Sequence, residues 1–173
     1  MITLICGTNR PNNQSQKFIN IYKTLLKKRN VACKEIYLEH LPNDLAFAND
    51  VISTATKELK SEIEQKMIPA TKLVIVVPEY NGSFPGVLKS FIDCIEPKHF
   101  KGKTVALVGV SAGRSGNLRG MDHLTGIFHY LGAEVLATKV DVANIHTIID
   151  ENGNPNDEGV IRRMNRQIDQ LVK

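Results

Sequence analysis

The loop from Gly7 to Ser15 carries the residue types that bind a phosphate dianion. Thr8 and Ser15 offer hydroxyl groups, Arg10 offers a forked guanidinium, and Gly7 permits a tight turn. A helix is expected after Ser15, and the first amides of a helix have no partner within it. Neither the P-loop sequence nor G-x-G-x-x-G follows this first strand. The loop therefore predicts a phosphate site of another kind, with a helix cap at Ser15 and a solvated Arg10 as the alternative.

A second loop, Pro78–Gly86, combines backbone amides with the aromatic ring of Tyr80 and small polar side chains. It follows the apolar run Leu73–Val77, which predicts a strand buried on both faces. Ligands of open parallel sheets bind at the carboxyl ends of the strands, so this loop predicts a site for a flat, partly polar ring. The alternative is that Tyr80 packs on a neighbour and that Asn81 closes a turn with the glycine after it.

A third loop, Ser111–Asn117, follows another apolar run and contains two glycines, which let the backbone approach a ligand closely. Its amides could donate to the electron-rich edge of a ring, although an ordinary glycine-containing loop has the same composition. Because the strands of a parallel sheet all point the same way, the three loops share one rim. A phosphate pocket, an aromatic loop and a glycine loop around one cleft describe a mononucleotide site.

Strand and helix patterns alternate about five times, which predicts an α/β fold with a parallel sheet covered by helices on both faces. The predicted strands are Ile2–Cys6, Ala32–Leu38, Leu73–Val77, Thr104–Val110 and Glu134–Val142. The predicted helices are Gln16–Lys28, Ser53–Met67, Gly86–Ile95, Leu118–Leu131 and Glu158–Leu171. No repeat, low-complexity tract or linker interrupts the pattern, so residues 1–173 predict a single domain.

The composition is that of a globular protein, with 42% hydrophobic and 23% charged residues among 173. No apolar run approaches the roughly 20 residues that a membrane span needs, and no signal-peptide pattern opens the chain. The three cysteines lie far apart, which predicts reduced thiols and a cytoplasmic location. The net charge of +4 is spread along the chain, which argues against a nucleic-acid partner and suits an anionic ligand.

No metal site is predicted. The five histidines show no metal-ligand spacing. The stretch Asp150–Asp157 has alternating Asp and Asn like a calcium loop, but Pro155 stands where the sharp-turn glycine belongs and Ile161 where the bidentate glutamate belongs. His146 follows the last predicted strand and could line the cleft.

Two motifs give the chain a resemblance to the NAD(P)H-dependent FMN reductases of the flavodoxin-like superfamily, which include azo-, quinone- and chromate-reducing members. Gly7-Thr8-x-Arg10-Pro11 with Ser15 is similar to that family's phosphate loop. The stretch from Pro78 to Ser83, followed by Pro85-Gly86-x-Leu88-Lys89, is similar to its most specific signature. The resemblance covers nearly the whole chain and implies a three-layer sandwich with a five-stranded parallel sheet in the order 2-1-3-4-5.

The resemblance also implies roles for individual residues. The FMN phosphate would be held by Thr8, Arg10, Ser15 and the amide of Gln16. The isoalloxazine would be framed by Pro78, Glu79, Tyr80 and Asn81, with Ser111 and Gly113 closing the far side. The chain departs from the family in having Cys94 where tryptophan is frequent, and Arg114-Ser115-Gly116 where many members carry a glycine pair. Arg114 would stand near the mouth of the pocket.

The expected function is that of an FMN-dependent oxidoreductase, which passes hydride from NADPH or NADH to FMN and on to a flavin, quinone, azo compound or similar small acceptor. FMN carries the chemistry, so no catalytic side chain is expected. A flavodoxin-type electron carrier is the alternative, and a receiver domain is set aside because its acidic cluster is absent. A homodimer is expected, because the helices after the second and third loops have apolar residues beyond one core face: Phe91, Ile95, Ile127, Phe128 and Tyr130.

Overall fold

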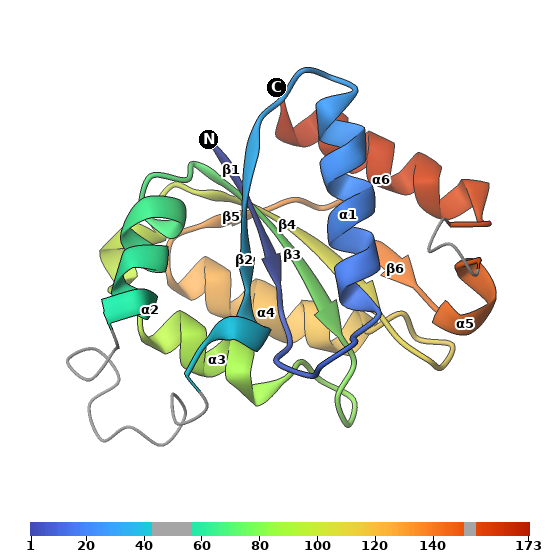
Figure 1. Ribbon diagram of the computed structural model, residues 1–173, viewed down its shortest axis with the longest axis horizontal. Helices are drawn as coiled ribbons and strands as arrows, with labels where there is room; N and C mark the ends of the chain where they lie inside the picture. Colours follow the sequence, from blue (N-terminus) through green and yellow to red (C-terminus); the bar gives the residue numbers. More distant parts are fainter. Residues whose placement is uncertain (43–56, 151–154) are drawn as a thin grey trace.

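Six parallel strands form one sheet in the computed structural model, which describes residues 1–42, 57–150 and 155–173 (Figure 1). The order β2-β1-β3-β4-β5, with β6 also pairing β4, is the flavodoxin-like order that the resemblance implied. In the register, Ile5 lies opposite both Ile36 and Ile75, and Ile75 lies opposite Leu107. The strands are β1 (Ile2–Cys6), β2 (Cys33–Tyr37), β3 (Lys72–Pro78), β4 (Thr104–Val110), β5 (Glu134–Val135) and β6 (Val140–Val142).

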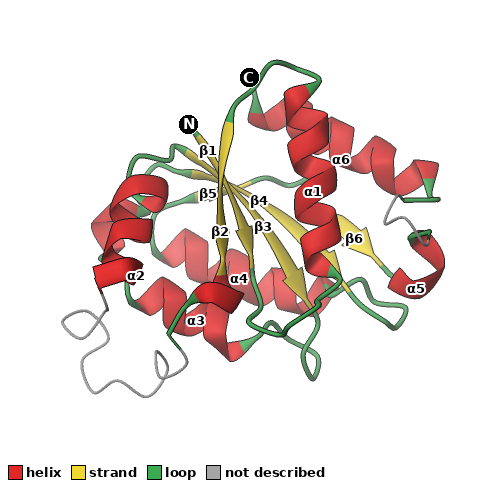
Figure 2. Ribbon diagram, in the orientation of Figure 1, coloured by secondary structure: helices red, strands yellow, loops and turns green. Residues whose placement is uncertain are grey.

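Helices cover both faces of the sheet (Figures 1 and 2). One face carries α1 (Ser15–Lys27), α5 (Ile145–Ile148) and α6 (Glu158–Leu171), and the other carries α2 (Lys57–Glu62), α3 (Gly86–Asp93) and α4 (Leu118–Tyr130). Single 3-10 turns occur at Leu38–His40 and Pro97–His99, and a π-helical turn, Ile63–Met67, continues α2. None of the helices among the described residues is long and apolar enough to cross a membrane.

The apolar core has two layers, one on each side of the sheet. Along β3, Leu73, Ile75 and Val77 pack into the layer beneath α2, α3 and α4, whereas Val74 and Val76 pack into the layer beneath α1 and α6. All five side chains are buried, as expected for a strand covered on both faces. The predicted α/β sandwich is therefore confirmed.

The predicted fifth strand, Glu134–Val142, is wrong in one respect, because the segment is divided between β5 and β6. Both parts pair with β4, at Thr104–Val105 and at Val108–Val110. Between them, the side-chain amide of Gln167 on α6 donates to the carbonyls of Leu107 and Thr138, at 3.0 and 2.7 Å. A buried side chain thus takes the place of backbone pairing and interrupts the ladder.

Several predicted boundaries shift by one or two residues. The first helix begins at Ser15 and ends at Lys27, and the third helix ends at Asp93. The start of the predicted helix Ser53–Met67 and the central part of the Asp150–Asp157 loop lie outside the described residues. Three residues expected on an apolar outer surface, Phe91, Ile95 and Phe128, are instead buried in the core.

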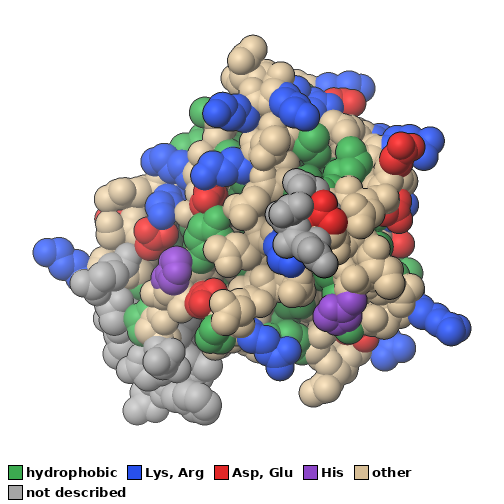
Figure 3. Space-filling model, turned by 45° about the vertical axis from the view of Figure 1, so that its right-hand side comes forward, with side chains coloured by type: hydrophobic (Ala, Val, Ile, Leu, Met, Phe, Trp, Pro, Cys, Tyr) green, Lys and Arg blue, Asp and Glu red, His purple; other side chains and the backbone are tan. Residues whose placement is uncertain are grey.

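The carboxyl ends of β1, β3, β4 and β6 lie at one rim of the sheet, and the loops that follow them gather there (Figure 1). On the face drawn in Figure 3, Lys and Arg side chains are interspersed with Asp and Glu rather than gathered in one patch. The rim therefore brings together the three loops that the sequence analysis identified. The described residues on the face drawn in Figure 3 form no continuous stripe of Lys and Arg side chains.

Candidate functional site

A cavity of about 300 Å³ lies at the rim between these loops. Its lining combines the loop after β1, the loop after β3, the loop after β4 and the start of α5. Six of the residues predicted from the sequence line it, namely Arg10, Ser15, Pro78, Glu79, Tyr80 and Ser111. The remaining predicted residues, Thr8, Gln16, Asn81, Gly113 and Arg114, do not contribute to its lining. His146, which the sequence suggested could line the cleft, is part of the wall.

Ser15 lines this cavity and has a side chain that makes no hydrogen bond in the structure. The residue is 1% exposed, and its hydroxyl has no hydrogen-bond partner. A buried hydroxyl without a partner is costly, and buried polar groups are almost always paired. It occupies the first position of α1, where the helix dipole favours an anion. The residues present at this point fit a phosphate group.

Asn13 organises the loop that leads into α1, and the sequence analysis missed it. Its Oδ1 accepts from the Gln16 amide at 3.0 Å and from the Cys6 thiol at 3.3 Å, while its Nδ2 donates to the Arg10 carbonyl at 2.9 Å. The signal for this role was an asparagine just before a helix, where such side chains cap free amides. The Gln16 amide would have to leave Asn13 in order to bind a phosphate.

Tyr80 joins the loop after β3 to the loop after β1. Its hydroxyl and the Thr8 hydroxyl are 2.8 Å apart, and the Arg10 guanidinium lies 5.4 Å from its ring centroid. The Thr8 hydroxyl also accepts from the Arg10 amide at 3.2 Å. Thr8 is fully buried, so in this structure it positions Tyr80 and Arg10 and does not line the cavity.

The residues after Tyr80 form a tight turn. Tyr80 and Ser83 exchange two backbone hydrogen bonds of 2.9 and 3.0 Å, and Asn81 and Gly82 both have positive φ, at 49° and 76°. This is the Asn-Gly turn that the sequence left open as an alternative role for Asn81. The turn is also held from α4, because the Ser83 hydroxyl lies 2.9 Å from Nδ1 of His123.

The loop after β4 is held to β3 by side-chain hydrogen bonds. The Ser115 hydroxyl donates to the Glu79 carboxylate. Asn117 donates from Nδ2 to the carbonyls of Val77 and Pro78, at 3.2 and 3.0 Å. Within the loop, Ser111 accepts from the Gly116 amide at 2.9 Å. Because these bonds cross between the two loops, the relative positions of Glu79 and Ser111 are fixed before any ligand binds.

Asn117 allows a matched test of how the loop after β4 is held to β3. Its side chain makes two hydrogen bonds to β3, and its backbone is left-handed at φ 58°. Asn117→Gly keeps the backbone conformation but loses both bonds, so it is expected to lower the free energy of unfolding by about 1–3 kcal/mol. Asn117→Ala should cost about 1 kcal/mol more, because alanine disfavours the left-handed region. Urea unfolding of both variants checks this; an alanine variant as stable as the glycine variant would contradict it.

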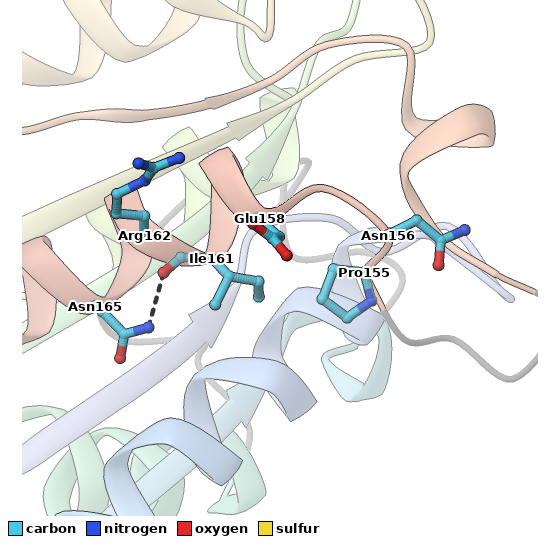
Figure 4. A pocket seen from close by; sticks show the side chains of 6 residues that line it. All are labelled: Pro155, Asn156, Glu158, Ile161, Arg162 and Asn165. Carbon is cyan, nitrogen blue, oxygen red and sulfur yellow. Dashed lines mark hydrogen bonds between the residues drawn. The ribbon is translucent and has the colours of Figure 1, made fainter.

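A cavity of about 350 Å³ is lined by β2, the 3-10 turn after it and α2, and two further cavities lie on helices away from these loops. One, of about 430 Å³, is formed by Pro155 and the first turns of α6; Figure 4 shows Ile161 there, whose carbonyl accepts from Asn165 at 2.9 Å. The other, of about 750 Å³, is an apolar groove on α3 and α4. Among the residues that the structure describes, no group of three or more His, Cys, Asp or Glu could hold a metal ion. The rim cavity is lined by loops of the kind that bind a mononucleotide.

Two curated relatives resemble the chain in sequence. A 2-hydroxy-1,4-benzoquinone reductase of a Burkholderia species is 33% identical over 102 residues, a stretch that spans 56% of each of the two chains. The FMN-dependent NADPH-azoreductase of Staphylococcus aureus is 25% identical over 173 residues, which cover 98% of this chain and 92% of the azoreductase. The chain thus spans about half the length of the first relative and nearly all of the second.

The fold is shared with FerB, a flavoenzyme NAD(P)H:(acceptor) oxidoreductase from Paracoccus denitrificans, with a TM-score of 0.79 and 21% identity over 99% of this chain and 94% of FerB. At this identity the likeness supports the fold alone. The family of NADPH-dependent FMN reductases matches residues 1–147, which include β1 to β6 and all the loops of the rim. The chain therefore belongs to the NADPH-dependent FMN reductase family.

Proposed function

We propose that the protein is an FMN-dependent oxidoreductase that takes hydride from NADPH or NADH and passes electrons to a quinone, an azo compound, a flavin or a similar small acceptor. The observation that carries this proposal is the buried, unpartnered hydroxyl of Ser15 at the start of α1, in a cavity that Arg10 also lines. Family membership supports FMN and NADPH. The names of the relatives support quinone and azo acceptors.

The phosphate of FMN would be held by Ser15, Arg10 and the first amides of α1. Thr8 would act indirectly, since its hydroxyl positions Tyr80 and Arg10. The ring system would lie between the loop after β3, with Pro78, Glu79 and Tyr80, and the loop after β4, with Ser111, Gly113 and Arg114 at the outer end. Bound FMN supplies the hydride-transfer chemistry, so these residues bind and orient it.

The thiol nearest the site is not a competing redox group. Burial raises the pKa of Cys6 to about 12, so the thiol stays protonated at neutral pH. In that form it donates to Asn13 Oδ1 and supports the loop. Because the thiolate is the reactive form of cysteine, Cys6 is inert at the rim and the redox chemistry falls to the flavin.

The chain also has features that suit a hydride transfer in which one flavin face stays open. It has no tryptophan, and Tyr80 is the aromatic residue that lines the cavity. Tyr80 is held in place by Thr8 and Arg10. It would cover one edge of the flavin and leave the other face to the nicotinamide and then to the acceptor. Successive binding at one open face accommodates planar acceptors of different kinds.

A second copy of the chain is the proposed occupant of the groove on α3 and α4. The groove is lined by Ile92, Ile95, Ile127 and Leu131, and Tyr130 beside it is 90% exposed. An apolar groove of about 750 Å³ next to an exposed aromatic ring is a surface suited to a symmetric contact. We also propose that residues 1–173 act as one domain in the cytoplasm, where Cys6, Cys33 and Cys94 would remain unpaired as they are in the structure.

Tyr130→Asp tests the dimer without disturbing the fold, because the side chain it replaces is exposed. Wild-type protein is expected to sediment as a dimer at micromolar concentration, and the variant as a monomer, since the new carboxylate would be buried without a partner. Lys28→Asp, a charge change on an exposed residue after α1, is the control and should remain dimeric. A monomeric wild-type protein would remove this part of the proposal.

The function is tested by steady-state oxidation of NADPH with 2-hydroxy-1,4-benzoquinone and with an azo dye as acceptors. Protein reconstituted with FMN should oxidise NADPH at a rate that depends on the acceptor, and protein freed of FMN should not. A flavodoxin-type carrier would retain FMN but leave NADPH unoxidised. That result would replace the proposal by the electron-carrier alternative.

A further inference from the structure

The turn from Tyr80 to Ser83 lies between β3 and α3, and Tyr80 is the residue of this turn that lines the rim cavity. Its first end is fixed to the sheet, because the Glu79 amide donates to the Val110 carbonyl of β4 at 2.8 Å. Its second end is joined to the first by the two backbone hydrogen bonds between Tyr80 and Ser83. A displacement of Ser83 would therefore be passed directly to Tyr80.

Two side chains of α4, those of Arg119 and His123, hold this turn. Nδ1 of His123 lies 2.9 Å from the Ser83 hydroxyl. The Arg119 guanidinium packs on Gly82, since a Cβ at that glycine would lie 2.9 Å from one of its nitrogens. Residues four apart share one face of a helix, so both contacts come from the same side of α4. The turn thus rests on α4, and the hydrogen bond between Ser83 and His123 fixes its second end.

The helix α4 is a firm support for the His123 side chain. Met121 and Leu124, on either side of His123 in the helix, are fully buried in the core. At the start of the helix, Asn117 is hydrogen-bonded to the end of β3. Without His123, the Ser83 end of the turn would lose its hydrogen bond to an element that is itself fixed to the sheet.

We propose that His123 is a positioning residue for hydride transfer. By holding Ser83 it keeps Tyr80, and through Tyr80 the flavin ring, in the orientation that a bound nicotinamide requires. This role rests on the proposed function, because it needs FMN in the rim cavity and NADPH as the donor. The step oxidises NADPH to NADP⁺ and reduces the flavin by the two electrons of one hydride. Its rate depends steeply on alignment, since a misplacement of about 1 Å can cost about 100-fold.

The expected effect is on the rate of hydride transfer rather than on FMN affinity. In the proposed function the FMN phosphate is held by Arg10 and Ser15, whereas the hydrogen bond of His123 goes to the turn after β3. Loss of one hydrogen bond of ordinary strength corresponds to an effect of about fivefold. The rate should therefore fall by about that factor while the Kd for FMN stays within about twofold of the wild-type value.

The test begins with a matched pair of variants, His123→Leu and His123→Asn. The two side chains have the same shape, but asparagine keeps a polar atom where Nδ1 of the imidazole stands. Under anaerobic conditions and saturating NADPH, the flavin of His123→Leu should bleach about fivefold more slowly than that of the wild type. His123→Asn should restore most of the rate. His129→Leu, the same change at an exposed residue of the same helix, is the control and should behave as the wild type.

Ser83→Ala removes the same hydrogen bond from its other end. This variant is needed because His123 also lines the groove on α3 and α4, where a second copy of the chain is proposed, and Ser83 does not. Ser83→Ala should slow bleaching by the same factor as His123→Leu, and the double variant should be no slower than either.

A second measurement needs neither flavin nor NADPH. In the apoprotein, hydrogen exchange of the backbone amides of residues 80 and 83, followed by NMR, reports how firmly the turn is held. Both amides should exchange faster in Ser83→Ala and in His123→Leu than in the wild type, and His123→Asn should restore their protection. Unchanged exchange in His123→Leu would show that His123 does not hold the turn.

Three further results would overturn this role while leaving the proposed function intact. One is a His123→Leu variant that bleaches as fast as the wild type although its amides exchange faster. The second is a double variant in which the two rate losses multiply, because the two side chains would then act separately. The third is a loss of FMN affinity that accounts for the slower rate. A wild-type protein that binds no FMN, or leaves NADPH unoxidised, would overturn the proposed function and this role with it.

Discussion

Ser15→Ala is expected to weaken FMN binding at least tenfold and to leave the apoprotein as stable as the wild type or slightly more stable. The two effects separate a ligand-binding hydroxyl from a structural one. In the structure the hydroxyl is buried and unpaired, so removing it relieves a desolvation cost in the absence of ligand. With FMN bound, the variant loses a hydrogen bond to a charged phosphate, which is worth about 1.5–3 kcal/mol.

The measurement is a fluorescence titration with FMN, together with urea unfolding of the apoprotein. Ser90→Ala is the matched control, because the Ser90 hydroxyl lies on α3 and already donates to the Gly86 carbonyl at 3.2 Å. It should bind FMN like the wild-type protein. A Ser15→Ala variant that binds FMN normally, or whose apoprotein is clearly destabilised, would show that the hydroxyl has a structural role.

Gly109→Ala is expected to lower the free energy of unfolding by about 3 kcal/mol and to weaken FMN binding as well. Gly109 lies in β4 under the loop that follows the strand. A Cβ there would overlap the Gly116 carbonyl oxygen and lie 2.8 Å from the terminal methyl of Met121. A backbone carbonyl cannot move aside as a flexible side chain can. Either the loop after β4 must therefore shift or β4 itself must be displaced. Moving the loop also moves Ser111, which lines the cavity, and Ser115, which donates a hydrogen bond to Glu79.

Gly86→Ala serves as the control, because a Cβ at the first residue of α3 meets no atom within 4 Å. It should leave the free energy of unfolding unchanged or raise it by up to about 1 kcal/mol, since alanine restricts the unfolded chain. Urea unfolding of both apoproteins gives the comparison. If Gly109→Ala unfolds at the same urea concentration as the control, the close approach of the loop to β4 is not a constraint on the fold.

The fold could be predicted largely from the sequence, because its strands are short apolar runs and its helices have a clear apolar period. The predicted strands Ile2–Cys6 and Thr104–Val110 have the observed bounds. The division of the last strand could not be predicted. It depends on Gln167, whose side-chain amide donates to the carbonyl of Leu107, 60 residues away in the sequence. No local sequence pattern indicates such a contact.

The site could be predicted only at the level of its loops. Strand ends in a parallel sheet share a rim, and that rule brought Arg10, Tyr80 and Ser111 together before the structure was considered. Which side chains face the cavity depends on contacts between distant segments. The sequence shows that Thr8 has a hydroxyl group, but in the fold that hydroxyl is hydrogen-bonded to the hydroxyl of Tyr80, 72 residues away. The unpaired state of Ser15 is likewise a property of the packed structure alone.

Anaerobic addition of NADPH to the FMN-reconstituted, desalted protein tests the central claim most directly. The flavin absorbance should survive desalting if Ser15, Arg10 and α1 hold the phosphate as proposed. It should then bleach within seconds as hydride is transferred. Flavin that is retained but stays yellow would contradict a nicotinamide-dependent reductase and favour an electron carrier. Protein that emerges from desalting without flavin would contradict the assignment of the rim cavity as an FMN site.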